Sequence, residues 1–225
     1  MDATNQICCK EGTLLVPGTS PIVFVVDDDI SVRESLEVLI QDEGWHVATF
    51  TSAEEFLNRP REFIPSCLVL DISMPGLNGL ELQKRLAVER PDIPIIFLTG
   101  HGDIPKTVQA IKAGAVEFLT KPFSDSTLLF AIRGAIDRSK ALISRDAELR
   151  ALKARYARLT SRQREVLALV VDGKANKEVA NELGITEVTV KAHRGSMMQK
   201  MGAGSLAELV NQAARLRLLR PNRKP

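Results

Sequence analysis

The stretch IVFVVDDD, residues 22–29, places three carboxylates directly after five apolar residues. A short apolar run with a charged end is typical of a strand buried inside a parallel sheet. Three similar runs follow in the chain, and each leads into a polar residue: residues 67–70 lead into Asp71, 95–98 into Thr99 and 116–120 into Lys121. Because the carboxyl ends of parallel strands meet at one edge of a sheet, the pattern predicts that Asp27, Asp28, Asp71, Thr99 and Lys121 lie close together.

Helical patterns alternate with these runs. Val32, Leu36, Leu39 and Ile40 have the spacing of one helix face, and similar patterns precede each later strand. Strict alternation of strands and helices predicts an α/β fold with a five-stranded, doubly wound parallel sheet covered on both faces. Five strands and five helices are expected, ending near residue 138.

The charge of the chain is distributed unevenly. Residues 21–138 hold 11 lysines and arginines against 18 aspartates and glutamates, whereas residues 139–225 hold 18 against 8. A basic half favours a polyanion such as nucleic acid as partner, and an acidic half suits a cation site. A charge imbalance that is merely solvated is the alternative.

The sequence divides into four segments. Residues 1–20 have no sustained periodicity and are expected to form a flexible tail, followed by the α/β domain over residues 21–138. Residues 139–158 lack Gly and Pro and place Leu142, Leu149, Leu152 and Tyr156 at helical spacing, which predicts a helical linker. Its leucines either pair with a second copy in a short coiled coil or lie on a monomeric, solvated helix.

The last segment, residues 159–225, has the helix start and stop signals of an all-α domain of four helices. Thr160 and Gln163 fit a capping box that starts a helix ending near Val171, and Gly173 follows its end. A second helix is expected to carry Val179, Ala180 and Leu183, and Gly184 predicts a tight turn after it. Thr186 and Ser205 are expected to cap the third and fourth helices. The arrangement is a helix-turn-helix.

The residues at the strand ends suit phosphoryl chemistry. Clustered carboxylates require a cation, and ligation by oxygen alone favours Mg2+. Asp71 stands alone and can act as a nucleophile that forms an aspartyl phosphate. Lys121 can pair with a phosphoryl oxygen, and the Thr99 hydroxyl can bind another.

These residues together resemble the receiver domain of bacterial two-component response regulators, which has a flavodoxin-like fold. The acidic pair of the family falls on Asp27 and Asp28, the phosphoacceptor on Asp71, the hydroxyl on Thr99 and the Lys-Pro pair on Lys121 and Pro122. The resemblance implies that the backbone carbonyl of Ser73 joins Asp27, Asp28 and Asp71 around Mg2+. It also implies that Phe118 is the switch aromatic that turns inward when Thr99 moves toward the phosphoryl group.

The last segment resembles the LuxR-type helix-turn-helix of the NarL/FixJ response regulators. The resemblance rests on LTSRQREVL (residues 159–167), NKEVA (176–180), LGI (183–185), TVKAHR (189–194) and KM (200–201). It implies that DNA is contacted by Asn176, Lys177, Thr189, Lys191 and Arg194. Lys191 and Arg194 are three residues apart, so we expect them to share one helix face. Gly195 stands where some relatives carry a basic residue, and that contact is not carried over.

The resemblance implies a DNA-binding transcriptional regulator that a sensor histidine kinase phosphorylates on Asp71. Phosphorylation would control dimerisation or interdomain contacts and thereby promoter binding, with double-stranded promoter DNA and RNA polymerase as partners. The three cysteines cannot form a disulfide framework, and no run of eighteen apolar residues occurs, so a cytoplasmic protein without membrane contact is expected.

Two alternatives remain at this stage. One is a regulator that works without phosphorylation. The other is an aspartyl-phosphate phosphatase of the haloacid dehalogenase type, which would carry an acid two residues after its nucleophile. That position is Ser73 here, so a non-enzymatic role is preferred.

Overall fold

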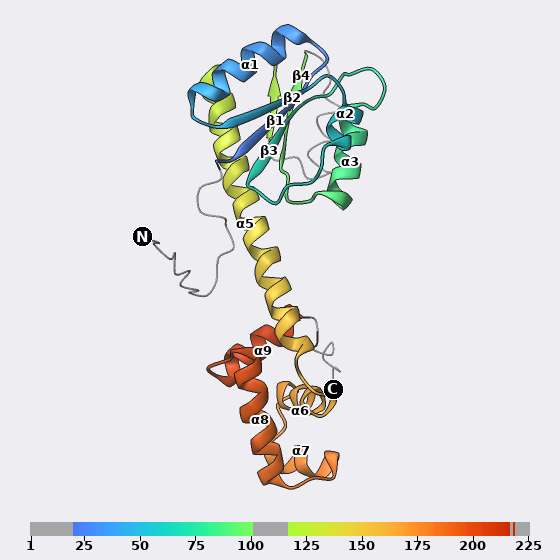
Figure 1. Ribbon diagram of the computed structural model, residues 1–225, viewed down its shortest axis with the longest axis vertical. Coiled ribbons are helices and arrows are strands. Elements are labelled where there is room, and N and C mark those ends of the chain that lie inside the picture. Colours follow the sequence, from blue (N-terminus) through green and yellow to red (C-terminus); the bar gives the residue numbers. More distant parts are fainter. Residues whose placement is uncertain (1–19, 101–116, 217, 219–225) are drawn as a thin grey trace, which may run out of the picture. The chain divides into compact units, whose positions relative to one another are not determined.

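The computed structural model describes residues 20–100, 117–216 and 218 (Figure 1). The chain separates into two compact units, with the division after Arg145. The first unit is built on a sheet and the second consists of helices. The expected tail and the helical pattern around Val108 lie outside the described residues.

The sheet has five parallel strands. Their bounds are β1 (Ile22–Val26), β2 (His46–Phe50), β3 (Ser66–Asp71), β4 (Ile95–Thr99) and β5 (Glu117–Thr120). Their order across the sheet is β2-β1-β3-β4-β5, so the direction of winding changes between β1 and β3. The predicted five-stranded, doubly wound sheet is confirmed. Ligand sites in such folds lie at the carboxyl ends of the strands where the winding reverses.

Helices cover both faces of the sheet (Figure 1). The helices α1 (Ile30–Asp42) and α5 (Asp125–Ala157) lie on one face, and α2 (Ala53–Asn58) and α3 (Gly79–Glu89) lie on the other. Successive strand residues face opposite layers. Val25 and Val69 pack toward α1 and α5, whereas Phe24 and Leu68 pack toward α2 and α3. The near-continuous apolar runs of the sequence follow from this double burial.

One glycine brings α3 close to the site edge of the sheet. A Cβ atom at Gly79 would lie 2.6 Å from the backbone oxygen of Asp71 and 3.2 Å from the Phe97 ring. The Gly79 amide also donates to the Ile72 carbonyl at 3.3 Å. The absence of a side chain at this position lets the helix start directly against the end of β3.

The helix α5 continues without a break through most of the expected linker and ends at Ala157. Leu152 is buried in the core of the helical unit, and Tyr156 packs against the same core. Ile143 is also buried, whereas Leu142 and Leu149 are half-buried. Leu152 is therefore committed to packing within its own chain, and the leucine spacing has an intramolecular explanation at that position.

The helical unit follows the caps predicted from the sequence. Its helices are α6 (Ser161–Val171), α7 (Asn176–Leu183), α8 (Glu187–Met201) and α9 (Leu206–Arg215). Thr160 and Gln163 form the capping box, and Thr186 and Ser205 cap α8 and α9. Gly184 ends α7 with a φ of 63°, a left-handed conformation that glycine adopts without steric cost. The predicted helix-turn-helix with four helices is confirmed.

We expect Gly79→Ala to lower the free energy of unfolding of the sheet unit by about 1–3 kcal/mol, because the added methyl group overlaps the backbone of β3. Gly134→Ala is the matched control, since a Cβ atom there has nothing within 4 Å in the middle of α5. It should raise the stability by about 1 kcal/mol. The chain has one tryptophan, Trp45, half-buried in the sheet unit, so urea unfolding can be followed by its fluorescence. Equal effects of the two substitutions would contradict the packing argument.

Candidate functional site

Two carboxylates lie next to each other at the carboxyl edge of the sheet. Asp27 follows β1 directly, and Asp71 is the last residue of β3. Val26 is paired with Leu70 in the sheet, so the two aspartates that follow are neighbours. Asp27 is 1% exposed and Asp71 is 8% exposed. Two buried carboxylates that lie side by side require a positively charged partner.

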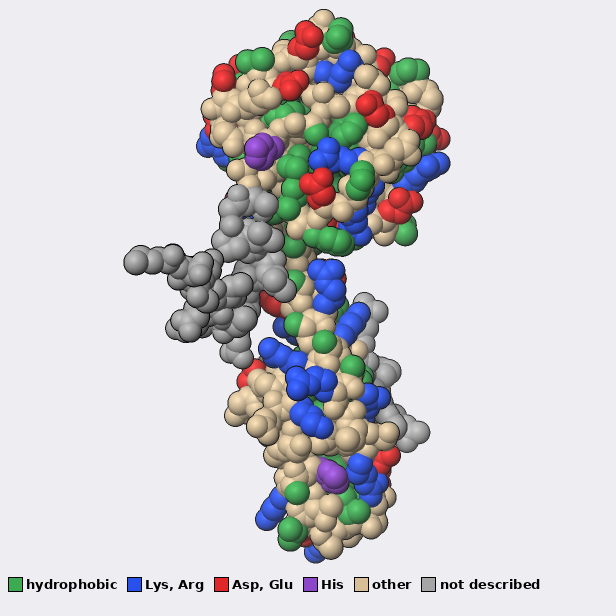
Figure 2. Space-filling model, in the orientation of Figure 1, with side chains coloured by type: hydrophobic (Ala, Val, Ile, Leu, Met, Phe, Trp, Pro, Cys, Tyr) green, Lys and Arg blue, Asp and Glu red, His purple; other side chains and the backbone are tan. Residues whose placement is uncertain are grey.

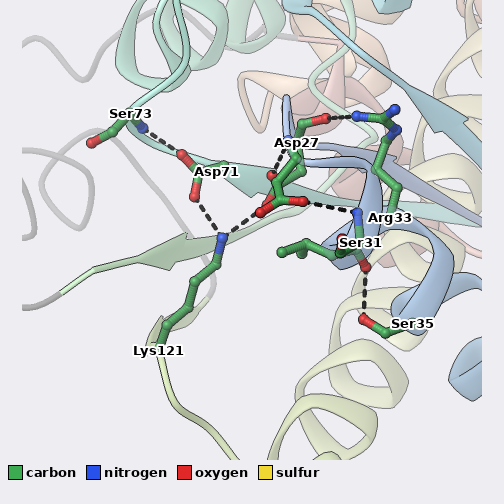
Figure 3. A network of polar contacts seen from close by, with 9 residues as sticks. Asp27, Ser31, Arg33, Ser35, Asp71, Ser73 and Lys121 are labelled. Carbon is green, nitrogen blue, oxygen red and sulfur yellow. Dashed lines mark hydrogen bonds and ion pairs between the residues drawn. The ribbon is translucent and has the colours of Figure 1, made fainter.

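Lys121 supplies that partner from the end of β5 (Figure 3). Its Nζ atom donates to Asp27 Oδ2 and to Asp71 Oδ1, both at 2.9 Å. Its backbone amide donates to the Thr99 carbonyl at 2.7 Å, which fixes the start of the loop after β5. Asp27 and Asp71 are 94 and 50 positions from Lys121 in the sequence. Residues at the ends of three strands thus meet in one hydrogen-bonded network.

The pKa values of the network reflect burial and hydrogen bonding acting in opposite directions. Burial raises the pKa of Asp27 above its ordinary value, and the hydrogen bond from Lys121 offsets this only in part. Burial by itself would lower the pKa of Lys121, but the hydrogen bonds to Asp27 and Asp71 outweigh it and raise that pKa. One ammonium shared between two carboxylates leaves a net negative charge at the site.

Two residues that hold Asp27 in place were not singled out as site residues from the sequence. The Asp29 amide donates to Asp27 Oδ1 at 3.0 Å, and Arg33 Nη1 donates to the Asp27 carbonyl at 2.6 Å (Figure 3). Asp29 also caps α1 by accepting from the Ser31 amide at 2.8 Å. An aspartate directly before a segment whose apolar residues have helical spacing is a helix-start signal, so this cap could have been predicted from the sequence. The Arg33 contact has no comparable signal.

The second oxygen of Asp71 is held by the loop that follows β3. Asp71 Oδ2 accepts from the Ser73 amide at 2.6 Å, and the side chain of Ser73 is exposed. Asp28 is exposed, and the hydrogen bonds described for Lys121 go to Asp27 and Asp71 instead. The structure thus brings together Asp27, Asp71, Ser73 and Lys121.

Thr99 ends β4, and Phe118 lies within the neighbouring strand β5, paired with Phe97. Thr99 is the last residue of β4 and is 2% exposed, and its hydroxyl donates to the Gly100 carbonyl at 3.2 Å. Phe118 in β5 is half-buried, with its ring centre 6.3 Å from that of Phe97. Neither side chain belongs to the network around Lys121. Residues 101–105 of the loop after Gly100 lie outside the described residues.

The oxygen atoms of this edge suit a hard divalent cation. Over residues 20–100 and 117–216, no three His, Cys, Asp or Glu side chains form a ready-made metal cluster. Magnesium, however, is usually held by one or two carboxylates together with water and phosphate oxygens. Asp27 and Asp71 provide two adjacent carboxylates with surplus negative charge, so the donor set fits Mg2+.

The residues expected to contact DNA divide into two groups. Lys177 and Lys191 are exposed on α7 and α8. Arg194 is half-buried and donates from Nη1 to Asn176 Oδ1 at 2.7 Å, which joins α8 to the start of α7. Thr189 is half-buried and bonds Thr186 at the cap of α8. Arg194 thus contacts α7 while Lys191 is exposed, and the DNA contacts of both residues remain predictions.

A buried glutamine at the start of α6 forms hydrogen bonds with α8. Gln163, 5% exposed, accepts from the Thr160 amide at 3.1 Å and from Lys200 Nζ at 2.9 Å, and its amide donates to Ser196 at 2.9 Å. One side chain thus completes the cap of α6 and fixes two positions on α8. Among the charged side chains in view, those of the helical unit are mostly lysine and arginine, whereas most acidic side chains lie on the sheet unit (Figure 2).

Family comparisons match both units. Residues 23–133 match the family described as response regulator receiver domain. Residues 157–213 match the family described as bacterial regulatory proteins, luxR family.

Several known proteins are similar to the chain over most of its length. Nodulation protein W of Bradyrhizobium diazoefficiens is 48% identical over 198 residues, which cover 88% of this chain and 87% of that protein. The transcriptional regulatory protein FixJ of the same organism is 40% identical, with 88% and 96% covered. The solved structure of the response regulator StyR is 47% identical with a TM-score of 0.77, and the match covers 88% of this chain and all of StyR.

We expect Lys121→Met to lower the free energy of unfolding of the sheet unit at about pH 7 by about 1–3 kcal/mol, because two buried carboxylates lose their cation. Without that hydrogen bond, the pKa of Asp27 in the folded protein rises further above its ordinary 3.8. The deficit relative to the wild type should therefore shrink as the pH falls toward about 5. The measurement is urea unfolding followed by Trp45 fluorescence.

Lys140→Met is the control, since Lys140 pairs only with Asp137 on the exposed side of α5 among the described ion pairs. Its effect should stay within about 0.5 kcal/mol at either pH. A Lys121 deficit that is independent of pH would show that the ammonium does not neutralise the buried carboxylates.

Proposed function

Because the chain belongs to the response-regulator family with a receiver domain and a LuxR-type helix-turn-helix domain, it is a DNA-binding transcriptional regulator, and we propose that phosphorylation of Asp71 switches it. The observation that carries the proposal is the network in which Lys121 bridges Asp71 and Asp27 at the carboxyl edge of the sheet. A sensor histidine kinase is the proposed donor of the phosphoryl group.

In the transfer step, Asp71 Oδ1 attacks the phosphorus atom of a phosphohistidine on the kinase. The O–P bond forms as the N–P bond breaks, and the imidazole leaves with the electron pair and takes up a proton. The Ser73 amide already binds the other oxygen of Asp71 and orients the carboxylate for this attack. Lys121 is placed to pair with a phosphoryl oxygen once Asp71 Oδ1 carries the phosphoryl group.

The proposed cofactor is Mg2+, held by the Asp27 and Asp71 carboxylates with Asp28 and the Ser73 carbonyl completing the oxygen donors. When bound, it would screen the charge of the incoming phosphoryl group. The geometry supports this assignment, because Asp27 and Asp71 are two adjacent buried carboxylates that share a single ammonium.

Thr99 and Phe118 are the proposed route from the phosphoryl group to the rest of the receiver. The Thr99 hydroxyl, which bonds the Gly100 carbonyl here, turns to a phosphoryl oxygen, and Phe118 moves inward beside Phe97. Such a change needs only to favour a conformation that is already accessible. Shifting an equilibrium from 1:99 to 99:1 requires about 5.5 kcal/mol of preference.

The proposed DNA-reading element is α8, with Lys191 as its central contact in the major groove. Lys177 on α7 is placed for a phosphate contact, and Thr189 and the Asn176–Arg194 pair lie at the junction of α7 and α8. A phosphorylated homodimer would set two such helices on half-sites about 34–36 Å apart on promoter DNA. RNA polymerase bound nearby is a further proposed partner.

None of the described helices is long and apolar enough to cross a bilayer. We place the protein in the cytoplasm because the promoter DNA that a bacterial regulator binds lies there.

We expect light scattering to show the wild type shifting from monomer to dimer when Mg2+ and acetyl phosphate are added. Asp71→Asn should remain a monomer, because an amide cannot accept the phosphoryl group. Asp137→Asn serves as the control, since this aspartate lies on α5 and its ion pair is with Lys140. It should dimerise like the wild type.

A dimer of Asp71→Asn under the same conditions would exclude control through this residue. A wild type that stays monomeric would exclude phosphorylation-driven dimerisation and leave release of the helical domain as the switch.

A further inference from the structure

One face of α8 is exposed and carries small and apolar side chains beside the charged Glu187 and Lys191. Its residues recur at helical spacing and are all exposed: Val188, Lys191, Ala192, Gly195 and Gln199. The opposite face is formed by Val190, Met197 and Met201, which are buried in the core of the helical unit. We call the exposed set the outer stripe of α8. Lys191 is its one charged member.

Arg194 does not extend this stripe. Its guanidinium group donates to Asn176 Oδ1 at 2.7 Å on the side that faces α7. Gly195 contributes no side chain, and a Cβ atom there would meet nothing within 4 Å. The N-terminal half of the stripe therefore presents one ammonium between an apolar side chain, Val188, and the methyl group of Ala192.

Val188 is the most exposed large apolar side chain described in the helical unit, at 76%, compared with 44% for Leu206 and 37% for Leu218. The hydrophobic core does not use it. It lies one turn before Lys191 in the first turn of α8, next to the helix cap at Thr186. In helix-turn-helix proteins, residues near the start of the second helix contact base edges.

We propose that Val188 is a specificity-determining residue that packs against the 5-methyl group of a thymine, next to the base that Lys191 contacts. This inference rests on the proposed placement of α8 in the major groove. Thymine is distinguished in that groove by its methyl group, and apolar side chains are the groups that contact it. A valine cannot bond a phosphate or the N4 amino group of cytosine, so a cytosine at this position leaves a donor unpaired.

The first experiment defines the binding site. Full-length protein with Mg2+ and acetyl phosphate selects duplexes from a library with randomised positions, for the wild type and for Val188→Ser. We expect the wild-type consensus to contain an invariant thymine in each half-site that becomes variable with Val188→Ser. Val88→Ser is the matched control, because Val88 is 83% exposed on α3 in the other unit.

The second experiment removes single methyl groups. Each dT of the selected duplex is replaced in turn by dU, which lacks only the 5-methyl group. We expect wild-type affinity to fall about fourfold at the thymine that Val188 contacts, the value for one buried methyl group. Val188→Ser and Val188→Ala should both lose most of this sensitivity at that one position and keep it elsewhere. Circular dichroism and the salt dependence of binding check that the variants fold and still bind phosphates.

Wild-type affinity that is unchanged by every dU replacement would overturn the proposal, as would Val188→Ser retaining the full methyl effect. If the wild type enriches no sequence at all, the placement of α8 in the major groove fails as well. Enrichment without a methyl effect would contradict only the role of Val188.

Discussion

The Lys121 ammonium between the Asp27 and Asp71 carboxylates is the interaction on which the receiver depends. Parallel strands with a change of winding between β1 and β3 bring the two acids side by side at the edge of the sheet. Burial removes them from water, and one lysine shared by both leaves the site short of positive charge. A divalent cation would stabilise the two carboxylates of such a site. A group that gives Lys121 a new anionic partner would also be bound favourably. The same lysine is tied through its backbone to Thr99, which joins the acids to the ends of β4 and β5.

Much of this arrangement could be predicted from local signals in the sequence. Apolar runs ending at Asp27, Asp71 and Thr99 locate the strands, and a parallel sheet necessarily collects their ends. Caps such as Thr160 with Gln163, and the tight turn at Gly184, depend on neighbours within a few residues and were predicted correctly. Asp71 and Thr99 are the final strand residues rather than the ones after, a difference of one position that leaves the site edge unchanged.

Long-range partners could not be predicted in the same way. Arg33 donates to the Asp27 carbonyl, and Arg194 donates to Asn176, because the packing of helices determines which long side chain meets which acceptor. The three-residue spacing predicts that Lys191 and Arg194 share a helix face, but it gives no sign of the hydrogen bond from Arg194 to Asn176. Leu152 shows the same limit, since helical spacing identifies an apolar stripe and not the surface that covers it. The consequence for function is that α8 presents an exposed apolar side chain, Val188, one turn before Lys191.

Intact-protein mass spectrometry after incubation with Mg2+ and acetyl phosphate, with borohydride trapping of the acyl phosphate and peptide mapping, tests the central claim most directly. The account predicts that the wild type gains a single phosphoryl group, that trapping places it on Asp71, and that the gain is abolished when EDTA removes the metal. A chain that gains no phosphoryl group, or carries it on a residue other than Asp71, would contradict the account.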